Sequence, residues 1–306
     1  MDKRIDIKIS FRCNNLCGFC AQGHKRDMYP DRSAETVTAE LKKAYKSGVR
    51  GVVFTGGEPS MHPAIIDFIR TAAKIGFNSI QLQTNGRTLA YPGFCRELVK
   101  AGLTEVGPSL HGAKAATHDA LTGAKGSFTQ SVTGIANAVR TGLPVLTNTV
   151  VTSANYRELP AIAALLIKLG VSQYQFAFIH IVGSAAENKK LLVPRKTAVM
   201  PYLKKALDLG RKKGVLCYTE AIPFCLMKGY EACVAERIIP AGPVVDADRF
   251  IEDYGAYRRA EGKVKGPRCA QCKYLEICEG PWREYPKLYG WTEFKPVKNF
   301  LKLKTK

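Results

Sequence analysis

The sequence lacks any run of apolar residues long enough to cross a lipid bilayer, which argues against a membrane-spanning helix. The first residues, Met1 to Ile5, also lack the apolar stretch of a secretory signal peptide and lead directly into a predicted strand. No internal repeat is visible beyond an alternation of strand-like and helix-like segments. We therefore expect a cytoplasmic protein without a membrane partner.

Acidic residues are scarce, because 26 Asp and Glu stand against 46 Lys and Arg, and the formal net charge is +20. A charge of this size attracts polyanions such as RNA. The basic residues occur as short doublets along the whole chain rather than as one stripe, a distribution that a solvated basic surface also explains. RNA therefore stays open as an alternative partner.

Ten cysteines in a chain expected in a reducing compartment are not read as disulfides. Six of them form two groups, which indicates metal binding. The first group has the spacing C-x3-C-x2-C and follows a short apolar strand. Three thiolates leave one iron of an iron-sulfur cluster open for a small molecule, whereas four would saturate it. The alternatives are a zinc knuckle with His24 as fourth ligand, or buried thiols. The first group is Cys13, Cys17 and Cys20, the second is Cys269, Cys272 and Cys278, and the remaining four are Cys95, Cys217, Cys225 and Cys233.

Short β-rich runs alternate with helix-length amphipathic segments up to about residue 180, which predicts an α/β protein with six βα units around a parallel sheet. The long loop through residues 111–126 carries no predicted helix. The predicted strands are 5–11, 52–54, 80–83, 105–110, 145–151 and 173–179, and the predicted helices are 38–47, 63–74, 93–101, 128–141 and 158–169.

The pattern changes near Val193. A further helix is predicted over 197–213 and a strand over 215–219, after which the chain is irregular and rich in Pro, Gly and aromatic residues. This last stretch cannot bury much by itself and is expected to depend on a metal. We predict two units, 1–214 and 215–306, the second ending in a basic, loosely held tail over 295–306.

Polar or glycine-rich stretches follow most of the predicted strands. In parallel βα architectures ligands gather at the carboxyl ends of the strands, so these stretches are expected to face one cavity together with the first cysteine loop. The stretches are Gly56-Gly57-Glu58-Pro59, Thr84-Asn85-Gly86, Ser109-Leu110-His111, Asn148 and Gly183.

This combination resembles the radical S-adenosylmethionine (SAM) enzymes. The C-x3-C-x2-C loop is intact, Phe19 stands where the family places an aromatic residue beside adenine, and Thr55 to Pro59 matches the family's second motif. The resemblance covers residues 4 to about 183 and implies a partial (β/α)6 TIM-type barrel. It also implies a [4Fe-4S] cluster on Cys13, Cys17 and Cys20, whose open iron chelates SAM, and an electron donor such as flavodoxin or ferredoxin.

By the same resemblance, Gly56, Gly57 and Glu58 bind the amino group of the methionine moiety. Weaker candidates for SAM contact exist on the later strands, and for each of them a turn or helix-cap role is the alternative. These candidates are Thr84, Asn85, Ser109, Asn148 and Gly183.

The second cysteine group, C-x2-C-x5-C, resembles the SPASM and Twitch extensions, which carry auxiliary iron-sulfur clusters. The full SPASM run continues with further cysteines, but no cysteine occurs here after Cys278. This departure implies one auxiliary [4Fe-4S] cluster in a small Twitch-like domain. We favour Cys225 as its fourth ligand over Cys217 or Cys233. Without a fourth cysteine, the cluster would keep an open iron that could hold substrate, and zinc is the alternative metal.

The sequence thus predicts an enzyme that reductively cleaves SAM to a 5′-deoxyadenosyl radical and abstracts hydrogen from a peptide or small-molecule substrate. RNA modification is the alternative, and a non-catalytic iron-sulfur or electron-transfer role is a distant third.

Overall fold

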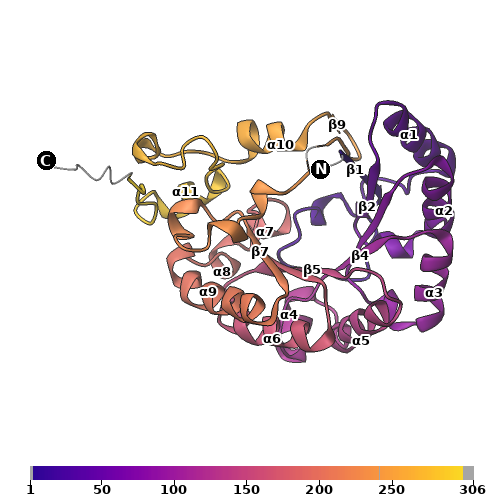
Figure 1. Ribbon diagram of the computed structural model, residues 1–306, viewed down its shortest axis with the longest axis horizontal. Helices are drawn as coiled ribbons and strands as arrows, with labels where there is room; N and C mark the ends of the chain where they lie inside the picture. Colours follow the sequence, from indigo (N-terminus) through magenta and orange to yellow (C-terminus); the bar gives the residue numbers. More distant parts are fainter. Residues whose placement is uncertain (1–2, 241, 299–306) are drawn as a thin grey trace, which may run out of the picture.

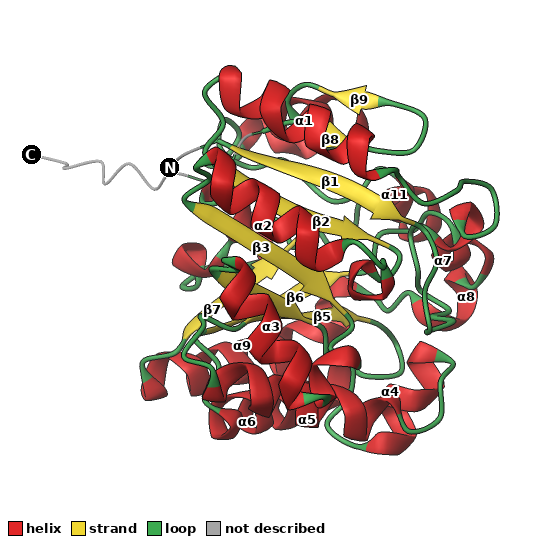
Figure 2. Cartoon of the chain, turned by 90° about the vertical axis from the view of Figure 1, so that its right-hand side faces the viewer, coloured by secondary structure: helices red, strands yellow, loops and turns green. Residues whose placement is uncertain are grey.

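The computed structural model describes residues 3–240 and 242–298, and they form a curved parallel sheet with helices on its outer face (Figure 1). Seven parallel strands follow one another around the curve. Figure 2 shows α1, α2 and α3 over β1, β2 and β3. The strands are β1 (Arg4–Ser10), β2 (Gly51–Gly56), β3 (Ser79–Thr84), β4 (Glu105–Pro108), β5 (Leu146–Val151), β6 (Gln173–Phe178) and β7 (Leu216–Glu220).

Six helices of at least ten residues, together with shorter ones, accompany the strands among the described residues. Within residues 3–240 and 242–298, no helix combines the length and the apolar character needed to cross a membrane. The helices are α1 (Ala34–Lys46), α2 (Ile65–Ile75), α3 (Pro92–Ala101), α4 (Ala115–Thr122), α5 (Ser127–Arg140), α6 (Leu159–Leu169), α7 (Ser184–Glu187), α8 (Lys189–Leu192), α9 (Lys196–Lys213), α10 (Tyr254–Tyr257) and α11 (Glu284–Tyr289).

The sheet is an open barrel. Hydrogen bonds order its strands as β4-β3-β2-β1-β8-β9 and β5-β6-β7, and bridges from Val106 to Val145 and from Ser109 to Asn148 join the two parts. The short strands β8 (Val244–Val245) and β9 (Phe250–Ile251) come from the C-terminal segment, and β8 pairs with β1. This segment, orange to yellow in Figure 1, therefore runs along the open side of the barrel. The predicted α/β partial barrel is confirmed.

The two faces of the sheet differ in polarity, because side chains alternate along each strand. Ile5, Ile7 and Ile9 of β1 are buried on the helix side. Polar side chains occupy the inner face, where Gln83 in the middle of the sheet is exposed and Glu220 is half-buried. The interior of the barrel is therefore lined with polar groups that solvent reaches.

Two local predictions were wrong. Helix α1 begins at Ala34 instead of residue 38, because the Ser33 side chain caps it by accepting a hydrogen bond from the backbone N–H of Thr36 at 3.2 Å. Helix α4 lies within the predicted loop. Its first turn carries no side-chain cap, so only Gly123 at its end marked it, while burial of His118 and Leu121 holds it in place.

The C-terminal predictions also change. Strand β7 pairs with β6 and belongs to the barrel sheet, so the boundary predicted after residue 214 falls before the last barrel strand. The predicted loose tail begins too early, because the Val297 carbonyl accepts from Lys273 N at 2.8 Å and Val297 N donates to the sulfur of Cys272 at 3.4 Å. Residues 299–306 lie outside the described residues.

Candidate functional site

The first cysteine loop directly follows β1, at the carboxyl end of the sheet. Helix α4 holds it from one side, since Leu16 N donates to Thr122 O at 2.7 Å and Gly18 N to Leu121 O at 3.3 Å. Asn188 holds it from the other side by donating from Nδ2 to Gly18 O at 3.0 Å. Helix α4, which was not predicted from the sequence, therefore positions the cysteine loop.

The three thiols of this loop lie close enough to influence one another. Burial and the neighbouring sulfurs of Cys20 and Cys13 together raise the pKa of Cys17 to about 12. Binding to iron releases the protons of such thiols. Among the described residues, no three His, Cys, Asp or Glu side chains converge as ligands of a single ion. The cysteines of a [4Fe-4S] cluster each bind a different iron, so the expected group needs no such convergence.

The Gly-Gly segment after β2 presses against the start of the cysteine loop. Gly57 N donates to Ser10 O and Glu58 N to Arg12 O, both at 2.7 Å. A Cβ on Gly56 would overlap Ser10 O, and one on Gly57 would overlap the carbonyls of Phe11 and Arg12. Glycine is required at both positions because the two backbones touch. This contact places the second motif beside the cysteines.

Glu58 lies at the centre of the strand ends and is fully buried. Its Oε1 accepts from Ser60 N at 3.0 Å, Ser60 Oγ at 2.5 Å and Thr84 Oγ1 at 2.6 Å, and its Oε2 accepts from Asn85 N at 2.6 Å. Burial raises the pKa of this carboxyl, while the four donors act in the opposite direction. Glu58 therefore ties the end of β2 to the end of β3, in addition to any contact with a ligand.

Asn85 connects the end of β3 to the cysteine loop. Its Nδ2 donates to Asn14 Oδ1 at 2.6 Å and lies 3.9 Å from Cys13 Sγ. Arg87, which the sequence did not single out, donates to the Asn14 carbonyl and to Asn15 Oδ1. Its place one residue after Thr84-Asn85-Gly86 was the only signal for it. These contacts fix the loop, so the turn residues have a structural role here.

The remaining candidates lie on or directly after β4, β5 and β6. Ser109 and Asn148 are bridge partners. Asn148 Oδ1 is buried and has no partner in the part of the chain that the structure describes, so it could accept a hydrogen bond from a bound ligand. Gly183, with φ of 56°, leaves no room for a Cβ next to the carbonyls of Cys20 and Ala21. Gly183 therefore lies against the cysteine loop, whereas Ser109 and Asn148 lie opposite each other where β4 meets β5.

Phe19 is 8% exposed and packs edge-on against the His111 ring at a centroid distance of 4.7 Å. His111 is a structural residue, since Val150 N donates to its Nδ1 at 3.2 Å. Burial lowers the pKa of His111 to about 3 and that of its neighbour His118 to about 4, so both rings are neutral near pH 7.

The second cysteine group shares one pocket with Cys225. Cys225, Cys269, Cys272 and Cys278 line this pocket with apolar and aromatic side chains such as Trp291. Burial and the other three sulfurs raise the pKa of Cys225 to about 12. Gly266 N donates to Cys269 Sγ at 3.3 Å and Val297 N to Cys272 Sγ at 3.4 Å, and such bonds tune sulfur ligands.

Cys217 and Cys233 do not line this pocket. They form a hydrogen-bonded thiol pair elsewhere, and both are buried. Cys217 also donates to Leu207 O at 3.4 Å. Of the three candidates for a fourth ligand, the structure brings only Cys225 to the second group.

Comparison with known proteins identifies the family. The model of the Radical SAM superfamily matches residues 7–166, which hold the cysteine loop, Glu58 and Asn148. The chain belongs to the radical SAM superfamily. Membership implies a [4Fe-4S] cluster and SAM as cofactors.

Two kinds of curated relatives are similar to this radical SAM protein. The PqqA peptide cyclase of Methylobacterium nodulans is 29% identical over 249 residues, which cover 78% of this chain and 64% of that protein. The probable GTP 3',8-cyclase of Saccharolobus solfataricus is 32% identical over 179 residues, 58% of this chain and 57% of that protein. The chain thus spans less than two thirds of the length of either relative.

Solved structures share the fold. Streptococcus suis SuiB bound to S-adenosylmethionine superposes with a TM-score of 0.67 at 16% identity, over 92% of this chain and 73% of SuiB. Native anSMEcpe with bound AdoMet gives 0.66 at 16% identity, over 92% of this chain and 89% of that chain. At these identities the likeness establishes the radical SAM architecture alone.

Proposed function

We propose that this protein is a radical SAM enzyme that acts on a peptide. Cys13, Cys17 and Cys20 would hold a [4Fe-4S] cluster, and SAM would lie between this loop and the ends of β2 to β5. When reduced, this pair of cofactors supplies a 5′-deoxyadenosyl radical that removes hydrogen from the substrate. The observation that carries the proposal is the backbone contact of Gly56 and Gly57 with the start of the cysteine loop, which joins the two family motifs in one site.

The residues around this site provide binding and shielding. The buried acceptor Asn148 Oδ1 needs a donor, and a SAM hydroxyl or ammonium group would supply it. Phe19 is buried in the apolar core, and Gly183 lies against the carbonyls of Cys20 and Ala21. A peptide is favoured over a small molecule because the similarity to a peptide cyclase extends over 249 residues. A cytoplasmic electron donor such as flavodoxin or ferredoxin would deliver the electron.

The activity is tested by incubating the anaerobically reconstituted, dithionite-reduced protein with SAM and measuring 5′-deoxyadenosine. We expect formation by the wild type and by Cys95→Ala, which removes a buried thiol of α3, and none by Cys17→Ala. Equal 5′-deoxyadenosine from wild type and Cys17→Ala would refute the assignment of the loop.

We further propose that Cys225, Cys269, Cys272 and Cys278 hold an auxiliary [4Fe-4S] cluster, which makes the segment after β7 a Twitch-like unit. The shared pocket and the two N–H···S bonds support this set of ligands. Two clusters require about eight iron atoms per chain and one requires about four. The iron content of Cys225→Ser is expected to fall to about four atoms per chain, whereas Cys217→Ser should keep about eight. A wild type with about four atoms would refute the second cluster.

RNA is a second candidate substrate, favoured by the net charge of +20. This alternative predicts that the purified protein retains tRNA with an affinity that falls steeply as salt is added. Failure to retain tRNA at low salt would eliminate it.

A further inference from the structure

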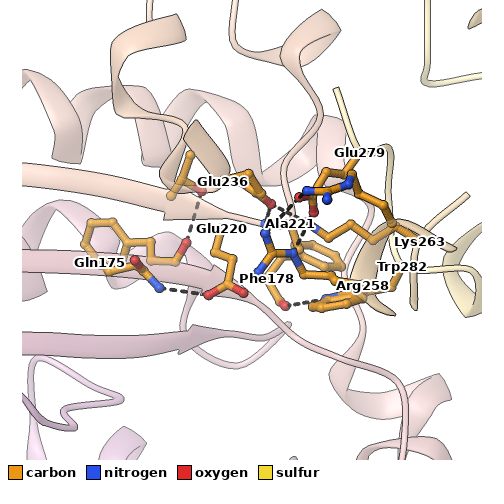
Figure 3. Close-up of polar contacts among 12 residues, drawn as sticks. Gln175, Phe178, Glu220, Ala221, Glu236, Arg258, Lys263, Glu279 and Trp282 are labelled. Atoms are coloured by element: carbon orange, nitrogen blue, oxygen red, sulfur yellow. Dashed lines mark hydrogen bonds and ion pairs between the residues drawn. The ribbon is translucent and has the colours of Figure 1, made fainter. Parts of the chain in front are cut away.

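A cluster of buried charges connects the last barrel strand with the C-terminal segment (Figure 3). Glu220 ends β7 on the inner face of the barrel, and Gln175 Nε2 of β6 donates to its Oε2 at 2.9 Å. Arg258 donates to both carboxylate oxygens of Glu279, from Nε at 2.6 Å and from Nη2 at 2.8 Å. Lys263 lies between Glu279 and Glu236 and contacts both. The cysteine motifs and the proposed cofactors use none of these residues.

The backbone next to Glu220 is strained. Among the described residues, Ala221 is the one non-glycine residue with a positive φ, at 59°. Two buried ionisable side chains hold it there, because Ala221 N donates to Glu236 Oε1 at 2.7 Å and Lys196 Nζ donates to Ala221 O at 2.8 Å. Strain of this kind persists only where surrounding structure imposes it, and it gathers at functional sites. It fixes the direction of Glu220.

Two side chains in this cluster have hydrogen-bonding capacity that no described residue uses. Arg258 is 2% exposed, yet its Nη1 is buried and has no acceptor among residues 3–240 and 242–298. Glu220 is half-buried, and its one hydrogen bond among the described residues is the one from Gln175. The two residues lie within electrostatic reach of each other, and Figure 3 shows them close together. Burial and the nearby Glu236 raise the pKa of Glu220, while the charges of Lys263 and Arg258 act in the opposite direction and favour the carboxylate. The site therefore offers one acceptor and one donor to a ligand.

The register of the sheet relates Glu220 to the proposed SAM contacts Ser109 and Asn148. Ser109 of the β4 end is the bridge partner of Asn148, Asn148 of β5 pairs with Gln175 of β6, and Ala177 pairs with Glu220 of β7. Neighbouring strands lie about 4.8 Å apart, so Gln175 stands one strand beyond Asn148 and Glu220 two. A substrate that reaches the reactive carbon of SAM would extend along this part of the inner wall.

We propose that Glu220 and Arg258 bind the main chain of an extended substrate at a single residue, with the carboxylate accepting that residue's N–H and Nη1 donating to its C=O. This proposal rests on the function proposed above and names how that site recognises a peptide. A carboxylate ligand would face the charge of Glu220, and an ammonium ligand would face the guanidinium and leave Nη1 unpaired. The uncharged N–H and C=O of one residue of an extended peptide satisfy both groups. Recognition of the main chain would be independent of the substrate's side chains.

The test measures binding of two blocked probes to the cluster-loaded protein with SAM present, by saturation-transfer NMR. One probe is N-acetyl-tetraalanine methylamide, and the other is oligolactate of equal length, in which ester oxygens replace the N–H groups but the carbonyls remain. The variants are Glu220→Gln, Arg258→Lys and the matched control Glu97→Gln, an exposed residue of α3. In Glu220→Gln the retained oxygen faces Gln175, so an NH2 group meets the peptide N–H.

We expect the wild type and Glu97→Gln to bind the peptide about ten- to hundredfold more tightly than oligolactate. Glu220→Gln should lose this preference without changing the affinity for oligolactate, whereas Arg258→Lys should weaken both probes. A wild type that binds both probes equally would overturn the proposal, and this comparison needs no variant to fold. A preference that survives in Glu220→Gln, or displacement of the peptide by guanosine in a Glu220-dependent way, would overturn it too.

Formation of 5′-deoxyadenosine is measured in the same samples. If no 5′-deoxyadenosine forms but the protein still prefers the peptide over oligolactate through Glu220, the radical activity is contradicted and the peptide site is supported. If 5′-deoxyadenosine forms but both probes bind equally, the radical activity is supported and the peptide site is contradicted.

Discussion

Replacing Glu58 by Gln separates a structural role from a role in SAM binding. Oε1 has three protein donors and Oε2 has one, so the amide oxygen is expected at Oε1 and the NH2 group opposite Asn85 N. A buried N–H left without an acceptor costs about 1–3 kcal/mol. The three other bonds lose their charge assistance, about 1 kcal/mol each. Relief from burying a charge offsets part of this loss, because burial raises the pKa of Glu58.

We therefore expect Glu58→Gln to lower the free energy of unfolding of the cluster-free protein by about 2–4 kcal/mol. The assay is anaerobic urea unfolding at pH 7, followed by circular dichroism without SAM. Thr84→Val, which removes one of the donors, should show a smaller loss in the same direction, and the exposed Glu97→Gln should show none. If Glu58→Gln changes the free energy of unfolding by less than about 0.5 kcal/mol, Glu58 does not tie β2 to β3.

Two further predictions follow from the same site. Gly57→Ala should push the second motif away from the cysteine loop, so this variant should bind little iron after reconstitution and be destabilised by about 1–3 kcal/mol. The control Gly93→Ala, whose added Cβ meets only the far end of Arg96, should bind as much iron as the wild type. Equal iron in both variants would contradict the backbone contact. His111 and His118 have depressed pKa values of about 3 and about 4 against 6.5 in a free side chain, so the unfolded chain binds more protons below pH 6.5 and stability must fall as the pH drops from 6.5 toward 4. The slope should be about 1.4 kcal/mol per pH unit for each histidine and should halve in His118→Asn; an unchanged slope would show that His118 is not buried as a neutral ring.

Patterns within single segments predicted most of the architecture. Alternating apolar residues located the seven parallel strands, and the place of the motifs at strand ends correctly predicted that the segment Gly57-Glu58 would lie against the start of the cysteine loop. Helix α4 was not predicted because its first turn carries no side-chain cap, and the start of α1 was misplaced because the Ser33 cap was overlooked.

Contacts between distant segments could not be predicted from sequence. The donors to Glu58 come from two strand ends, and only folding shows that Ser60, Thr84 and Asn85 surround one carboxylate. The pair of Glu220 and Arg258 is separated by 38 positions (258 − 220) and belongs to no motif. The positive φ of Ala221 could not be predicted from the residue type, because alanine rarely adopts this conformation.

The most direct test of the central claim is the electron paramagnetic resonance spectrum of the reduced, cluster-loaded protein with and without SAM. A cluster held by Cys13, Cys17 and Cys20 keeps one iron free, so SAM should change the spectrum of that cluster. Substituting the auxiliary ligand Cys225 by Ser should leave this response intact. A spectrum that SAM does not alter would contradict an open iron at the first loop and, with it, the proposed radical chemistry.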